Sequence, residues 1–184
     1  MLEYKPLTPD LWDDLEKLFG PHGADGGCWC MWWRIPRAQF VLDCGEPNKQ
    51  AFKEIVKSGV VPGILGYDKE KPVAWCAVAP REQYPVLDRS PLLKRIDAKS
   101  VWSIVCFFIH KDYRTQGLVK EIINAAAAYA KGKGVKIIEA YPVDSLVTKD
   151  GWKSFRGTVK TFQECGFEIA AQRKPGRPVM RRYF

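Results

Sequence analysis

Apolar residues in the first third of the chain follow helical spacing in two stretches. Thr8-Pro9 is typical of a helix start, because threonine can cap the free amides and proline suits the first helical position. Apolar positions then recur on one helical face as far as Phe19, and a glycine ends this helix. A second helix is predicted at Asn48–Ser58, with Asn48 as its cap, and a short opening strand at Leu2–Pro6.

The middle of the chain alternates strand, helix and strand. Val101–Ile109 is an unbroken apolar run of strand length, which favours a central strand buried on both faces. A helix is predicted at about Gly117–Lys131, and Val135–Tyr141 is the strand that follows. Parallel strands need such a crossover, so this stretch predicts a βαβ unit. Upstream, Gly63–Tyr67 and Pro72–Ala79 flank a polar turn and predict a β-hairpin.

The rest of the chain adds short elements to this unit. Pro91–Ile96 is predicted as a short helix inside a proline-bearing loop, and Thr158 caps another helix that ends at Cys165. Phe167–Ala171 and Pro178–Tyr183 are closing strands. No repeat or linker divides the chain, so residues 1–184 are expected to form one α/β domain. Its sheet would be mixed and strongly twisted, with helices on both faces.

Composition narrows the choice of partners. The 184 residues are 46% hydrophobic, which is enough for a full core. Lys and Arg number 29 against 21 Asp and Glu, for a formal net charge of +8. Such an excess suits nucleic acid or a small polyanionic cofactor. The basic residues are spread along the chain, however, which argues against a dedicated nucleic-acid surface.

Cysteine usage and hydropathy predict a compartment. Six cysteines are present, and two of them lie within apolar runs, as reduced core cysteines do. The N-terminus lacks the pattern of a secretion signal, and no run approaches the ~20 apolar residues of a membrane span. We expect a reduced, cytoplasmic protein without a disulfide framework and without a membrane partner.

Candidate chemistry lies at the turn after the central strand, where Arg114–Lys120 reads RTQGLVK. The first amides of a helix have no partner within it and carry the positive end of its dipole. A diphosphate placed there gains several charge-assisted hydrogen bonds. Gly117 would let the anion approach the backbone, and Arg114 and Lys120 would add countercharge. The alternative is an ordinary strand-to-helix turn.

This turn resembles motif A of the GNAT family of N-acetyltransferases, whose pattern is Arg/Gln-x-x-Gly-x-Gly/Ala. Arg114 and Gly117 match, whereas Val119 stands where the family usually has glycine or alanine. Cys165–Phe167 resembles the family's Gly-Phe after its last short helix, and the order of elements agrees along the chain. Gly26–Arg34, with its Cys-Trp-Cys stretch, resembles a subgroup of members with no known substrate.

The resemblance implies a GNAT-like fold that binds acetyl-CoA or coenzyme A as co-substrate, in a cleft between Val101–Ile109 and Val135–Tyr141. Backbone groups of the first strand would pair with the pantetheine arm, and an amide there would polarise the thioester carbonyl. The implied coenzyme A residues are Phe107, Phe108, Ile109, Arg114, Thr115, Gln116, Gly117, Leu118, Val119, Lys120, Thr158 and Phe162.

The resemblance also implies direct attack of an amine on the thioester, so that much of the rate comes from proximity. Glu139, on the strand lining the cleft, is the candidate base, and its alternatives are exposure to solvent or pairing with a lysine. Many family members protonate the departing thiolate with a tyrosine at the position of Phe162. Phenylalanine has no such proton, which leaves the role to water, Tyr141 or Tyr129.

Trp29, Trp32 and Trp33 crowd a loop that borders the acceptor site in the family. Their aromatic faces could hold a substrate, or they could anchor the loop on the core. Cys28-x-Cys30 fits zinc spacing poorly, so we expect no metal. Lys174–Pro178 resembles a minor-groove hook without its first arginine, and a hairpin turn explains it better.

The sequence therefore predicts transfer of an acetyl or other acyl group to a primary amine of a small molecule or a peptide. A non-catalytic acyl-CoA sensor is the first alternative, favoured by Phe162. A basic nucleic-acid-binding protein is the second, favoured by the net charge. The sequence leaves the oligomeric state open, a homodimer included.

Overall fold

The computed structural model of the chain describes residues 2–144, 146 and 155–184. Its strands lie in one seven-stranded sheet with the order β1-β2-β3-β4-β5-β7-β6. In chain order they are β1 (Glu3–Pro6), β2 (Gly63–Asp68), β3 (Lys71–Pro80), β4 (Trp102–Ile109), β5 (Ile137–Ala140), β6 (Glu168–Gln172) and β7 (Pro178–Tyr183). β4 and β5 are parallel, and every other neighbouring pair is antiparallel. The predicted mixed sheet is confirmed.

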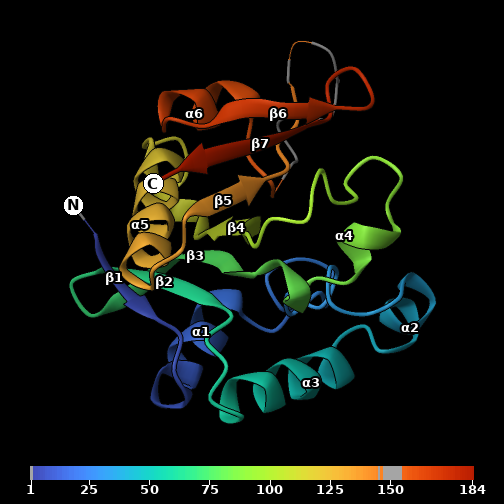
Figure 1. Cartoon of the computed structure of the whole chain (residues 1–184). Helices are drawn as coiled ribbons and strands as arrows, with labels where there is room; N and C mark the ends of the chain where they lie inside the picture. Colours follow the sequence, from blue (N-terminus) through green and yellow to red (C-terminus); the bar gives the residue numbers. More distant parts are fainter. Residues whose placement is uncertain (1, 145, 147–154) are drawn as a thin grey trace.

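The helices of the described residues are α1 (Trp12–Phe19), α2 (Arg37–Leu42), α3 (Glu46–Lys57), α4 (Val86–Arg89), α5 (Leu118–Gly132) and α6 (Val159–Glu164). Short 3-10 turns lie at Pro9–Leu11, Arg81–Gln83 and Lys111–Tyr113. Figure 1 shows α1, α2 and α3 grouped at the end of the molecule that holds the first strands, with α6 at the opposite end.

Two hydrophobic clusters lie on the two faces of the sheet because side chains alternate along each strand. On one face, β3 and β4 pack against α5, whose buried positions include the small residues Ala126 and Ala130. α6 adds Phe162 to this cluster. Leu15 and Phe52, from α1 and α3, belong to the cluster on the other face.

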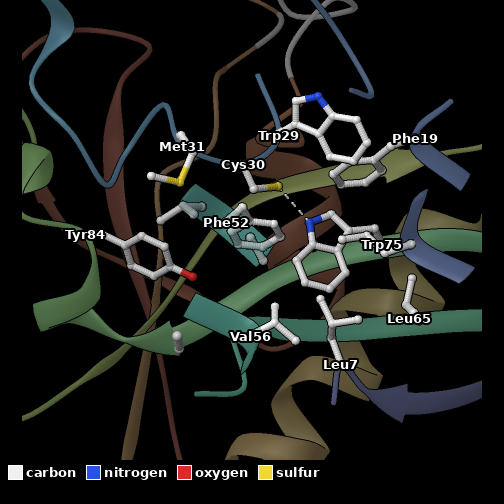
Figure 2. Packing of buried hydrophobic residues seen from close by; sticks show 14 of the residues in the cluster. Leu7, Phe19, Trp29, Cys30, Met31, Phe52, Val56, Leu65, Trp75 and Tyr84 are labelled. Carbon is white, nitrogen blue, oxygen red and sulfur yellow. Dashed lines mark hydrogen bonds between the residues drawn. The ribbon is translucent and has the colours of Figure 1, made fainter. Parts of the chain in front are cut away.

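Trp75 of β3 is the centre of this second cluster. Its indole ring lies edge-on to Phe19 and Phe52, and its Nε1 donates a hydrogen bond to the sulfur of Cys30 at 3.0 Å (Figure 2). Trp29 packs against the same Phe19. Trp29 and Cys30, in the first half of the Gly26–Arg34 loop, therefore anchor this loop on the core.

Several predicted element boundaries were wrong. Asn48 does not cap a helix: α3 begins at Glu46, and the Asn48 side chain is buried and donates to the Gly27 carbonyl at 3.3 Å. Helix α2 was not predicted. Pro91–Ile96 forms turns rather than a helix, and the helical turn of this loop is α4, just before it.

Candidate functional site

The turn before α5 presents free backbone amides. Gly117 has φ +78°, and a Cβ added there would meet no atom within 4 Å. Thr115 also has a positive φ, +65°. Within the part of the chain that the structure describes, the amides of residues 115–119 donate no hydrogen bond, and no side chain caps the helix. They are the first amides of a long helix, where an anion is favoured.

Side chains of this turn fold back without covering those amides. The Thr115 hydroxyl donates to the Arg114 carbonyl at 2.6 Å, and the Gln116 amide donates to the Asp112 carbonyl at 3.0 Å. Arg114 Nε donates to the Ile109 carbonyl at 3.0 Å, which leaves its terminal nitrogens exposed beside the turn. The ammonium of Lys120, which was predicted to add countercharge, forms an ion pair with Glu164 of α6.

β4 and β5 pair over their first residues only. The register runs from Trp102 opposite Ile138 to Ile104 opposite Ala140 and stops there. β4 continues to Ile109 along β3, and among the described residues its other edge has no strand partner beyond Ile104. The cleft predicted from the sequence between these two strands requires that they separate in this way.

Within the described residues, the segment that follows β5 contacts this free edge at Phe107. The Phe107 amide donates to the Phe155 carbonyl at 2.6 Å. Amides alternate along a strand, so those of Cys106 and Phe108 face β3. Of the predicted residues Phe107, Phe108 and Ile109, Phe108 therefore turns its backbone amide toward β3 and away from the free edge.

Gly157 belongs to the segment after β5, which contacts β4 at Phe107 and the residues just beyond β5 at Val143. Its amide oxygen accepts from the Val143 amide at 3.1 Å, just beyond the end of β5. A Cβ at Gly157 would lie 3.1 Å from the Phe162 ring and 3.4 Å from the Phe107 ring, and its φ is +75°. Only glycine fits a position that combines this φ with such close rings.

A cavity of about 700 Å³ lies beside β4, on the face that carries Trp75. Val105, Cys106, Phe107 and Phe108 of β4 form one wall, next to the point where the strands part. Trp32 and Trp33 come from the loop before α2, and Phe155 comes from the segment that meets β4. Its size is that of a small-molecule site.

Comparison with known proteins supplies the family. A model described as the acetyltransferase (GNAT) family matches residues 29–148, which is more than half of the chain. The chain belongs to the GNAT family. It is an acetyl-CoA-dependent N-acetyltransferase, as the motif at Arg114 and Gly117 predicted. A comparison with curated protein sequences found no match.

Solved structures agree with this GNAT protein over its whole length. The PaiA N-acetyltransferase of Thermoplasma acidophilum, solved with coenzyme A, is 12% identical with a TM-score of 0.56, covering 100% of this chain and 99% of that one. A GNAT acetyltransferase of Listeria monocytogenes is 10% identical with a TM-score of 0.62, covering 100% and 95%. Mosquito arylalkylamine N-acetyltransferase like 5b is 9% identical with a TM-score of 0.58, covering 100% of both chains. At these identities the similarity shows the fold.

Glu139 is buried and paired with arginines in this GNAT fold. Its carboxylate is buried and accepts from Arg81 at 3.1 Å and from Arg181 at 2.8 Å. Tyr141 donates to the same carboxylate at 2.8 Å and accepts from Arg81 at 2.6 Å. Neither residue lines the cavity. A carboxylate held by two guanidinium groups is a poor base for an incoming amine, so the geometry argues against the catalytic roles predicted for Glu139 and Tyr141.

Phe162 and Thr158 hold α6 in place. Phe162 is fully buried, with Phe107 on one side and Phe167 on the other. Thr158 caps α6 through a hydrogen bond that its hydroxyl accepts from the Thr161 amide at 3.3 Å. The Phe162 ring is thus packed among aromatic side chains, and it carries no hydroxyl that could protonate the departing thiolate.

The three tryptophans of the loop have different positions. Trp29 is buried, stacks on Trp12 and does not line the cavity. Trp32 and Trp33 line it, so of the three residues predicted to contact the acceptor only these two can do so. Burial and, after it, the charge of neighbouring Cys30 raise the pKa of the Cys28 thiol to about 12, so Cys28 is a poor thiolate.

Sequence reasoning missed four arginines that line the cavity: Arg37, Arg89, Arg156 and Arg177. They are far apart in the chain, and no local pattern connects them. It also missed Gly157, because the neighbouring Arg156 and Thr158 form no motif that predicts a required glycine there. The structure describes every residue that the sequence predicted for the site. Leu146 is also described, next to residues 147–154, which are not. No helix of the described residues is long and apolar enough to cross a membrane.

Proposed function

We propose that this GNAT protein binds acetyl-CoA with its diphosphate at the turn of residues 114–120 and its pantetheine arm along the free edge of β4. The acceptor amine enters from the cavity beside Trp32 and attacks the thioester next to Phe107. The observation that carries the proposal is the meeting of three features at one edge: uncapped amides before α5, parted parallel strands, and a cavity on the same strand.

The amides of residues 115–119 support the place of the diphosphate. They donate to no other described group, and the open space at Gly117 lets a phosphate oxygen come within hydrogen-bond distance. Arg114 adds a positive charge whose terminal nitrogens make no described hydrogen bond. Lys120 contributes less than the sequence predicted, because Glu164 already neutralises it.

The free edge of β4 supports the place of the pantetheine arm. The Phe107 amide is the donor that faces this edge, and it now binds the Phe155 carbonyl. A bound pantetheine amide or thioester oxygen would take over this donor, so Phe155 has to give up one hydrogen bond when the cofactor enters. An amide in this place stabilises the oxyanion that forms during acyl transfer.

The reaction is a direct transfer. The nitrogen lone pair attacks the thioester carbonyl, the tetrahedral intermediate collapses, the carbon–sulfur bond breaks, and coenzyme A leaves as the thiolate. The amine proton passes to water, because Glu139 and Tyr141 are engaged elsewhere and Phe162 has no hydroxyl. Positioning then supplies most of the rate.

The sequence also left open an acyl-CoA sensor without turnover. Glu139 is held by arginines, and Phe162 replaces an acid used by many relatives, so the described site lacks the usual proton-transfer groups.

Thiol release from acetyl-CoA, measured with a panel of primary amines, distinguishes the two candidates. The transferase requires amine-dependent release well above hydrolysis, and mass spectrometry should find the acetylated amine. Calorimetric binding of coenzyme A without any amine-dependent release would favour the sensor. Absence of binding would remove both candidates.

A further inference from the structure

Four arginine side chains line the cavity beside β4. Arg37 lies at the start of α2, Arg89 at the end of α4, Arg156 just before Gly157, and Arg177 in the turn between β6 and β7. Asp25 is the one acidic side chain among the described lining residues. Four guanidinium groups against one carboxylate give the cavity a strong preference for anions.

Arg156 and Arg177 are close enough to repel one another. Burial and, after it, the neighbouring positive charge of Arg177 lower the pKa of Arg156 to about 10. The guanidinium of Arg156 also lies over the Trp33 ring, with 6.0 Å from its carbon to the ring centroid. Two like charges brought together at a half-buried site are stabilised by an anion that binds both.

Arginines outside the cavity show the contrast. Arg81, Arg95 and Arg181 each form an ion pair with at least one carboxylate. Within the described residues, Arg89 and Arg177 form none. Their charges are therefore available to a ligand.

Much of the remaining lining of the cavity is apolar and aromatic. Trp32 packs edge-on against Phe40, and Phe108 and Phe155 also line the cavity. A planar or aliphatic body fits such a surface, because burial of apolar area drives its binding.

We propose that the acceptor is a small amine that also carries a carboxylate, held by Arg156 and Arg177 while its apolar body lies against Trp32 and Trp33. The inference rests on the proposed function, since it takes the cavity as the acceptor site. It disfavours polyamines and lysine-rich peptides, whose additional positive charges would meet the four arginines.

A matched pair of probes tests the charge preference. 4-(Aminomethyl)benzoate and 4-(aminomethyl)benzamide have nearly the same shape and the same amine, and differ in the negative charge. Calorimetric titration into protein saturated with coenzyme A should show at least ~10-fold tighter binding of the benzoate, the effect of one charged hydrogen-bonded pair. Equal affinities, tighter binding of the benzamide, or no binding of either probe would overturn the proposal.

Arg177→Gln locates that preference. We expect it to weaken benzoate binding by ~10-fold or more and to leave benzamide binding unchanged. Lys174→Gln is the matched control: Lys174 is exposed in the same turn and does not line the cavity, so both probes should bind as in the unchanged protein. Arg177→Lys should restore part of the preference, since it keeps the charge and loses the planar fork.

Coenzyme A affinity, measured on the same variants, separates this inference from the proposed function. Unchanged coenzyme A binding in Arg177→Gln, together with loss of the benzoate preference, supports an acceptor site. If Arg177→Gln weakens coenzyme A and leaves the two probes alike, the arginines hold the cofactor instead and the inference is wrong. If the unchanged protein fails to bind coenzyme A while the benzoate preference persists, the proposed function fails and the anion site remains.

Discussion

The turn before α5 and the cluster around Glu139 are both rich in charge, and both were predicted from the sequence to act in the site. They differ in how their polar groups are used. The turn leaves the amides of residues 115–119 without a described partner. The Glu139 carboxylate receives hydrogen bonds from Arg81, Arg181 and Tyr141 and is buried.

The comparison teaches that residue type alone does not identify a functional group. A donor or acceptor can bind a ligand when the fold leaves it unsatisfied and accessible, whereas a buried group with all its partners holds the fold together. The turn meets the first description and Glu139 the second. Four changes would break or sharpen this contrast.

Glu139→Ala should have the largest effect. It leaves Arg81 and Arg181 buried next to the void left by the Glu139 side chain. Removing one partner from a buried ion pair costs about 3–5 kcal/mol of unfolding free energy. Denaturant unfolding measures this loss. Glu70→Ala, at an exposed turn, is the control and should change stability little. A loss below about 1 kcal/mol for Glu139→Ala would contradict a structural role.

Gly117→Glu should abolish coenzyme A binding, by more than ~100-fold, because bulk and negative charge would meet the diphosphate. Gly134→Glu is a matched control at the other end of α5: Gly134 also has a positive φ, +79°, and open space for a Cβ. Both variants carry the same backbone strain and charge, so calorimetry should find loss of binding only at position 117. Equal affinities in the two variants would refute the proposed diphosphate site.

Tyr141→Phe should affect stability and leave the chemistry alone. Its hydroxyl bonds to Ser103 at 2.7 Å as well as to Arg81 and Glu139, so its loss should cost about 1–3 kcal/mol. The rate of acetyl transfer per folded molecule should stay within about threefold, a change worth less than 1 kcal/mol. A rate loss of ~100-fold with unchanged stability would restore the catalytic role that the sequence predicted.

Asp97→Asn should have the smallest effect, confined to acid. A hydrogen bond from Arg181 lowers the pKa of Asp97 to about 2. The native pKa lies below the unfolded value of about 3.9, so this ion pair stabilises the fold above pH ~4 and is lost as the pH falls toward ~2. Melting temperatures between those pH values should fall less steeply in the variant. An unchanged slope would contradict the ion pair.

The sequence predicted the sheet and the anion turn because both depend on local patterns. The apolar run at Val101–Ile109 and the helix after Gly117 were read from periodicity and became β4 and α5. The same reasoning placed Asn48 as a cap, and there tertiary structure prevailed, since its amide binds Gly27 across the loop.

The acceptor side of the site could not be predicted in this way. Arg37 and Arg177 line one cavity from positions far apart in the chain, and only the fold brings them together. The role of Glu139 depended on Arg81 and Arg181, which lie on other strands or turns and share no motif with it. Long-range partners of this kind decide whether a charged residue is free to act.

A crystal structure of the protein with acetyl-CoA tests the central claim most directly. The account predicts diphosphate oxygens within about 3 Å of the amides of Gly117, Leu118 and Val119, and a pantetheine arm along β4 in place of the Phe155 contact. A diphosphate bound elsewhere, with those amides facing water and Phe155 still on Phe107, would contradict it.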